Sequence, residues 1–198
     1  MIELKEQNIN TPEYWDKVFK KEIEENLSRV DLERFAMTEA RIKDNSDVID
    51  IGCGRGEFVE YLTKRKKLCR VLGIDFSKIA IDDAKKRILT AKFADIDIYK
   101  IADYKSLLER FDYVSCFEVI EHLDRPDLLI SNASKILKQS GYLILTTPYE
   151  NSILGGEEHV YSFDFQDMIN FFKKTEWDLI TLTRYYKNLN MFVLAKKI

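Results

Sequence analysis

Val48-Ile-Asp-Ile-Gly-Cys-Gly-Arg-Gly-Glu-Phe58 is the stretch of sequence that decides the fold. Its first four residues are biased toward apolar side chains, which predicts the end of a buried parallel strand. Three glycines follow at alternating positions, Gly52, Gly54 and Gly56, and a helical pattern begins directly after them. Because glycine lets a backbone approach a ligand closely, a strand, a glycine turn and a helix together predict a loop that binds a nucleotide cofactor.

The glycine spacing differs from that of dinucleotide-binding loops, which place glycines at relative positions one, three and six. Counted from Gly52, the sixth position is Glu57. A carboxylate at the start of a helix would repel a diphosphate, and Asp50 adds a second negative charge just before the turn. The loop therefore favours a cationic ligand. S-adenosylmethionine fits, because it carries an ammonium and a sulfonium.

A second acidic position supports the same cofactor. The predicted strand over residues 69–74 leads into Asp75, about 20 residues after the glycine turn, where an acidic side chain can accept both ribose hydroxyls of a nucleoside. Phe76 follows and can lie against adenine. Asp75 or Ser77 can also cap the helix that follows, and the two roles are compatible.

An acidic residue followed by G-x-G-x-G, as at Asp50 to Gly56, resembles the first motif of the class I S-adenosylmethionine-dependent methyltransferases. The resemblance covers about residues 45–198. It implies a Rossmann-like fold with S-adenosylmethionine as cofactor. It also implies that an N-terminal helical segment, residues 1–44, covers the site and precedes a methyltransferase domain over residues 45–198.

The rest of the chain alternates predicted strands and helices. Residues 11–43 read as helical with a break near 26–28, Thr11 as N-cap and Pro12 as first helical residue. Strands are predicted near 47–51, 69–74, 95–102, 112–117, 141–147, 178–186 and 190–196, and helices near 56–67, 77–90, 125–138 and 164–174, with a helix or turn near 104–110. The alternation predicts an α/β fold: a doubly wound, mostly parallel seven-stranded sheet with helices on both faces. The last two strands are too close in sequence for a helical crossover, so the C-terminal strand is expected to be antiparallel.

Composition narrows the functional classes. A chain of 198 residues with 45% hydrophobic and 33% charged residues is typical of one ordinary globular domain. A net charge of −3 argues against a nucleic-acid partner, which needs a basic footprint. We expect a cytoplasmic protein without a membrane segment, because no signal peptide or long apolar run is visible. Cys53, Cys69 and Cys116 are expected to be buried, reduced thiols.

Ligands of open α/β sheets bind outside the carboxyl ends of the strands. The end of the third predicted strand offers the Asp103 carboxylate to the adenine amine, and Ala102 and Tyr104 offer backbone groups. The predicted cofactor-binding residues are Asp50, Gly52, Cys53, Gly54, Gly56, Asp75, Phe76, Ala102, Asp103, Tyr104, Phe117 and Glu118.

The fourth predicted strand leads into Glu118, Glu121 and His122, which would share one face of a helical turn. His159, the second of the two histidines, lies after the fifth strand. Methyl transfer to oxygen or nitrogen requires alignment of the nucleophile and removal of its proton, and histidine titrates in the useful range. The predicted catalytic residues are His122, His159 and Glu118. The alternative is that Glu121 and His122 cap or satisfy local backbone and that His159 is an ordinary loop residue.

A metal is the alternative role for this region. Glu118, Glu121, His122 and His159 resemble the E-x-x-E-H pattern with a later histidine of the small-RNA 3′-terminal 2′-O-methyltransferases, and some quinone-type O-methyltransferases look similar here. In the RNA enzymes, that set binds a divalent metal. The segment before His159 is shorter than the histidine-rich region of the RNA family. A divalent metal is therefore possible but not expected.

Three functions follow. The first is a methyltransferase acting on an oxygen or nitrogen of a small molecule, with an acceptor site built from the N-terminal helices and residues 149–163. The second is a metal-dependent RNA-end methyltransferase, against which the acidic charge argues. The third is a non-catalytic adenosyl-binding module, against which the retained Asp50, Asp75, Glu118 and His122 argue.

Overall fold

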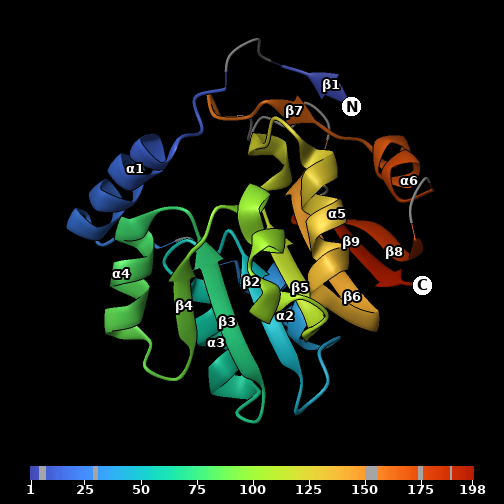
Figure 1. Cartoon of the computed structure of the whole chain (residues 1–198). Helices are drawn as coiled ribbons and strands as arrows, with labels where there is room; N and C mark the ends of the chain where they lie inside the picture. The colour runs from blue at the N-terminus through green and yellow to red at the C-terminus, as the bar shows by residue number, and fades with distance from the viewer. Residues whose placement is uncertain (5–7, 29–30, 150–155, 174–175, 188) are drawn as a thin grey trace.

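The computed structural model describes residues 1–4, 8–28, 31–149, 156–173, 176–187 and 189–198. Its centre is a seven-stranded sheet (Figure 1) formed by β2 (Asp47–Ile51), β3 (Arg70–Asp75), β4 (Lys92–Asp95), β5 (Phe111–Phe117), β6 (Leu137–Pro148), β8 (Trp177–Tyr185) and β9 (Asn190–Lys197). The spatial order is β4-β3-β2-β5-β6-β9-β8. Within this sheet, β9 runs in the direction opposite to the other strands and pairs antiparallel with both neighbours, β6 and β8. The predicted fold class is therefore confirmed.

Helices cover both faces of the sheet, as the alternation of strands and helices predicted (Figure 1). One face packs against α2 (Leu32–Glu39), α3 (Glu57–Arg65) and α4 (Lys78–Arg87). The other packs against α5 (Pro126–Ile136) and α6 (Phe165–Lys173). Strand residues alternate between the two cores, with Val48 in one and Ile49 in the other, because successive side chains of a strand point to opposite faces.

The N-terminal segment lies at the carboxyl-end edge of the sheet. Helix α1 (Pro12–Glu24) has Thr11 as its N-cap, as predicted, and packs on α4 through Trp15, Phe19 and Ala80. The strand β1 (Ile2–Glu3) pairs antiparallel with β7 (Tyr161–Ser162) near the top of Figure 1. Residues 2–3 and 161–162, which lie far apart in the sequence, are therefore neighbours in the structure.

The predicted strand over 95–102 is wrong. The strand β4 ends at Asp95, and a short 3₁₀ helix, η1 (Ile98–Asp103), follows. The alternation of Ile96 and Ile98 resembles strand periodicity, but the Asp97 side chain accepts a hydrogen bond from the amide of residue 99 at 2.9 Å and starts a helical turn. A second 3₁₀ helix, η2 (Lys105–Leu107), lies where a helix or turn was predicted.

Candidate functional site

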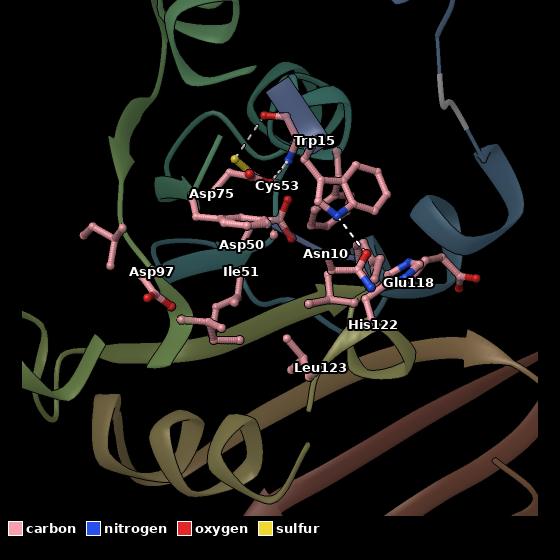
Figure 2. Close-up of a pocket in the computed structure, with 18 of the residues that line it drawn as sticks. Asn10, Trp15, Asp50, Ile51, Cys53, Asp75, Asp97, Glu118, His122 and Leu123 are labelled. Carbon is pink, nitrogen blue, oxygen red and sulfur yellow. Dashed lines mark hydrogen bonds between the residues drawn. The ribbon is translucent and has the colours of Figure 1, made fainter. Parts of the chain in front are cut away.

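The carboxyl ends of β2, β3 and β5 border a cavity of about 340 Å³, a size typical of small-ligand sites. Figure 2 shows Asp75 and Asp97 on one side and Asn10, Glu118 and His122 on the other. The predicted site residues that line the cavity are Asp50, Gly52, Cys53, Gly54, Asp75, Phe76, Phe117, Glu118 and His122. The N-terminal segment adds Asn8, Asn10, Trp15, Phe19, Arg34 and Phe35.

The glycine turn brings bare backbone to the cavity wall. Gly52 has φ +68°, and a Cβ there would lie 2.4 Å from Cγ2 of Val119. Gly54 has φ +52°, and a Cβ there would lie 3.2 Å from the Phe19 ring. Left-handed φ values and these close approaches both require glycine, so the turn is shaped to hold a ligand against its backbone.

Asp75 both caps the turn and faces the cavity. One carboxylate oxygen accepts a hydrogen bond from the Gly54 amide at 2.9 Å, and the other accepts one from the Ser77 amide at 2.8 Å. Ser77, rather than Asp75, is the N-cap of α4, since its hydroxyl accepts from the Ala80 amide at 3.2 Å. These bonds hold Asp75 in a fixed orientation at the end of β3.

The cavity lining carries an excess of negative charge. Its carboxylates are Asp50, Glu57, Asp75, Asp97, Glu118 and Asp124, and Arg34 is the one guanidinium among the described residues that line it. Burial raises the pKa of Asp50 to about 7, although Ser115 donates a hydrogen bond to it at 2.6 Å. Burial raises the pKa of Asp75 to about 6. A cationic ligand would restore the charged form of both.

Affinity for a cationic ligand is expected to fall as the pH decreases through about 7 and about 6, because protonation neutralises Asp50 and then Asp75. The stability of the unliganded protein should change in the opposite direction. An unfolded Asp carboxyl has a pKa near 3.8, so above that pH it has lost its proton, whereas the folded Asp50 carboxyl keeps its proton up to about pH 7. The free energy of unfolding therefore falls as the pH rises toward about 7. Calorimetric titrations and urea unfolding across pH measure both. Asp50→Asn should flatten both curves, and a flat wild-type affinity profile would contradict the expectation.

Glu118 and Arg34 form a partly buried ion pair at one end of the cavity. Glu118 follows β5 and has a φ of +53°. Its carboxylate lies 3.3 Å from Nη1 of Arg34. Thr146 and Asn190 donate hydrogen bonds to the same carboxylate at 2.7 and 3.0 Å. Burial raises the pKa of Glu118, while Arg34 opposes that shift. The buried Nε of Arg34 has no hydrogen-bond acceptor among the described residues, and the residue as a whole lines the cavity.

Glu121, His122 and His159 converge behind this end of the cavity. Their ligand atoms lie within 4.8 Å of one another, and the two imidazole centroids are 4.9 Å apart. Glu121 is 1% exposed, with one oxygen accepting from the Thr147 hydroxyl at 3.1 Å. Burial, with the nearby Glu118 charge, raises its pKa well above the usual range. The other oxygen lies 3.8 Å from His122 Nε2.

The tautomer of His122 follows from its surroundings. Its Nδ1 lies 3.0 Å from the backbone oxygen of Glu158, and a carbonyl oxygen can only accept a hydrogen bond. Nδ1 therefore carries the proton, which leaves the lone pair of a neutral imidazole on Nε2. His122 lines the cavity, whereas His159 packs against the His122 ring.

Two groups of predicted residues lie elsewhere. Gly56, Ala102, Asp103, Tyr104, Glu121 and His159 are not among the described residues that line the cavity. Ala102 to Tyr104 are displaced because β4 ends earlier than predicted and η1 follows it. Glu118 does not join the predicted four-residue cluster, because its positive φ turns its carboxylate toward Arg34 and Asn190. Within the loop 149–163, residues 150–155 lie outside the described residues.

Sequence reasoning missed Asn8, Asn10, Arg34 and Asp97, all of which line the cavity. Asp97 follows β4, so the strand-end rule would have found it had the strand been ended correctly. The N-terminal residues gave no local signal, because their role depends on where α1 and α2 pack.

Comparisons with known proteins find one matching family and several similar folds. A family model described as a methyltransferase domain matches residues 19–186. The ubiquinone biosynthesis O-methyltransferase of Coxiella burnetii (strain Dugway 5J108-111) is 30% identical over 145 residues, which are 66% of this chain and 60% of that protein. The chain thus spans less than two thirds of the length of this curated relative.

Solved structures share the fold. A SAM-dependent methyltransferase from Aquifex aeolicus superposes with a TM-score of 0.73 at 14% identity, over 95% of this chain and 99% of that one. The 1,6-didemethyltoxoflavin-N1-methyltransferase of Burkholderia thailandensis, solved with bound 1,6-didemethyltoxoflavin and S-adenosylhomocysteine, superposes with a TM-score of 0.72 at 14% identity, over 98% and 93%. At these identities the likeness is one of fold.

Proposed function

Because the chain belongs to the methyltransferase domain family, within the class I S-adenosylmethionine-dependent methyltransferases, we propose that it methylates a hydroxyl oxygen of a small molecule. The observation that carries the proposal is a mostly buried histidine, His122, with an assigned tautomer in the wall of an acidic cavity beside a glycine turn. The name of the Coxiella burnetii relative, an O-methyltransferase of ubiquinone biosynthesis, supports oxygen as the acceptor atom.

The cavity residues fit S-adenosylmethionine, which supplies an electrophilic methyl group on a sulfonium. Asp75 would accept hydrogen bonds from the ribose hydroxyls, and Phe76 and Ile96 would border the adenine. Asp50 would attract the ammonium of the methionine part. The Arg34 guanidinium, the one guanidinium among the described residues that line the cavity, would attract the methionine carboxylate. The excess of carboxylates favours a ligand with two positive charges.

His122 would act as the general base. Its Nε2 lone pair would take the proton of the acceptor hydroxyl as the oxygen bonds to the methyl carbon and the carbon–sulfur bond breaks. The Glu121 carboxyl group lies 3.8 Å from Nε2, close enough to favour the imidazolium when it is ionised. Trp15, Phe35 and Phe117 line the cavity with aromatic faces, which suits a flat, hydroxylated acceptor.

Turnover assays test the proposal. We expect the purified protein to methylate small hydroxylated aromatic molecules with S-adenosylmethionine as donor, and to leave the 3′ end of a small RNA unmodified. Radiolabelled methyl transfer to a panel of phenols, to amines of matched shape and to an RNA oligonucleotide measures this. Methylation of the RNA alone would overturn the proposal.

The convergence of Glu121, His122 and His159 favours a second candidate, a metal-dependent RNA 2′-O-methyltransferase. One carboxylate and two imidazoles fit a divalent transition metal in donor chemistry. The fourth expected ligand, Glu118, is engaged by Arg34, Thr146 and Asn190. This hydrogen bonding favours the metal-independent function.

Turnover is therefore expected to be insensitive to a chelator, because the proposed base needs no metal to accept a proton. The measurement compares initial rates after exhaustive dialysis against EDTA with rates after addition of Mn²⁺ or Mg²⁺. Loss of activity with EDTA, restored by a metal while S-adenosylmethionine binding persists, would favour the second candidate.

We further propose that residues 1–44 form the cover of the site over the domain 45–198, and that the protein works in the cytoplasm. Residues of α1 and α2 in the cavity wall support the first statement. The three cysteines are unpaired and buried, which suits a reducing compartment. Within the described ranges, no helix has the length and apolar character needed to span a bilayer.

A further inference from the structure

We propose that Asn8 and Asn10 are positioning residues that hold His122 in the tautomer needed for proton removal. This inference rests on the proposed role of His122 as the base. Both asparagines line the cavity beside His122, and Figure 2 shows Asn10 next to it. Nothing in the sequence pattern singles them out.

Asn8 holds the backbone of the histidine. Its Nδ2 donates to the His122 carbonyl oxygen and to an Asp124 carboxylate oxygen, both at 3.0 Å. Its Oδ1 accepts from the Asn10 amide at 2.8 Å and from Asn10 Nδ2 at 2.6 Å. One side chain therefore joins the short 3₁₀ helix η3 (Ile120–His122) to the segment that precedes α1.

Asn10 holds the partner of the imidazole ring. Its Nδ2 donates at 2.6 Å to the Glu158 carbonyl oxygen, the same oxygen that lies 3.0 Å from His122 Nδ1. Because that carbonyl is held in place, the Nδ1–H tautomer has a fixed acceptor, and the lone pair stays on Nε2.

Trp15 completes the arrangement from α1. Its indole Nε1 donates to Asn10 Oδ1 at 2.9 Å, the bond drawn in Figure 2, and its ring lies edge-on to His122 with centroids 5.3 Å apart. The pairing of β1 with β7 and the bond from the Leu4 amide to the Val160 carbonyl, at 2.7 Å, tie the N-terminal strand to the segment that carries Glu158. The asparagine pair thus links the backbone of His122, the Glu158 carbonyl and α1.

Asn8→Ala and Asn10→Ala are the variants that test this. Each is expected to lower kcat by roughly 10–100-fold, the scale for a misaligned catalytic group, with the KM for S-adenosylmethionine changed less than about twofold. Nitrogen-15 NMR of the imidazoles, recorded across a pH titration, should show the Nδ1–H tautomer of neutral His122 in the wild type and a mixture in the variants. The chain has two histidines, so His159→Gln assigns the signals.

Asn170→Ala is the matched control, since that exposed amide on α6 bonds only Gln166 among the described side chains, at 3.0 Å. If the alanine variants unfold, Asn10→Asp keeps the acceptor for Trp15 and removes the donated bond to Glu158. A kcat loss no larger than that of Asn170→Ala, or an unchanged His122 tautomer, would overturn the inference. If His122→Ala keeps full activity, the proposed function fails, and the tautomer measurement alone decides this inference.

Discussion

Replacing His122 with alanine is expected to lower kcat for methylation of a neutral hydroxyl by roughly 10²–10⁴-fold, the usual scale for loss of a general base. Affinity for S-adenosylmethionine should barely change, because the carboxylates proposed to bind the cofactor, Asp50 and Asp75, lie at the ends of other strands. Steady-state kinetics and calorimetry together measure both quantities.

The acidity of the acceptor provides the sharpest control. For a nitrophenol that is already ionised at the assay pH, removal of the base should matter far less, because no proton remains to be transferred. His159→Ala is expected to have a smaller effect than His122→Ala, since its ring packs behind His122 rather than lining the cavity. Wild-type turnover in a variant that combines His122→Ala with His159→Ala would show that alignment of the acceptor suffices without a base.

Asp75→Ala is the second large effect that we expect. It should weaken binding of S-adenosylmethionine by roughly 1–3 kcal/mol, the scale for removing a charged hydrogen-bond acceptor. S-adenosylhomocysteine should lose about the same amount, because both ligands present the same ribose. NAD should not bind the wild type, since Glu57 is placed at the start of α3. Isothermal titration calorimetry measures all three affinities.

Asp75 also accepts hydrogen bonds from the Gly54 and Ser77 amides, so part of the loss reflects the shape of the turn. Asp75→Asn separates the two contributions, because it keeps one acceptor oxygen and the size of the side chain. Asp82→Ala, an exposed carboxylate paired with Lys78 on α4, is the surface control. Unchanged affinity in Asp75→Ala would remove this residue from the cofactor site.

The part of the cavity wall at the ends of β2 and β3 was largely predictable from sequence, since β2, the glycine turn and β3 lie close together in the chain. Local rules of strand ends and glycine conformation place Asp50, Gly52, Gly54 and Asp75 on one edge of the sheet, and the structure places these residues in the cavity wall. The same rules failed after β4, because the spacing of Ile96 and Ile98 fits a strand and the Asp97 turn cannot be recognised from periodicity.

The sequence by itself determined the doubly wound sheet, the glycine turn and the identity of the acidic residues beside it, because local patterns of periodicity, glycine spacing and charge indicate each of them. Only the tertiary structure decided which groups surround His122. Across more than a hundred residues of sequence, Asn8 reaches the His122 carbonyl and Asn10 reaches the Glu158 carbonyl that bonds the imidazole. Glu118 turns toward Arg34 instead of Glu121. No local periodicity encodes these contacts, since they depend on how α1, α2 and the β1–β7 pair pack on the carboxyl edge of the sheet.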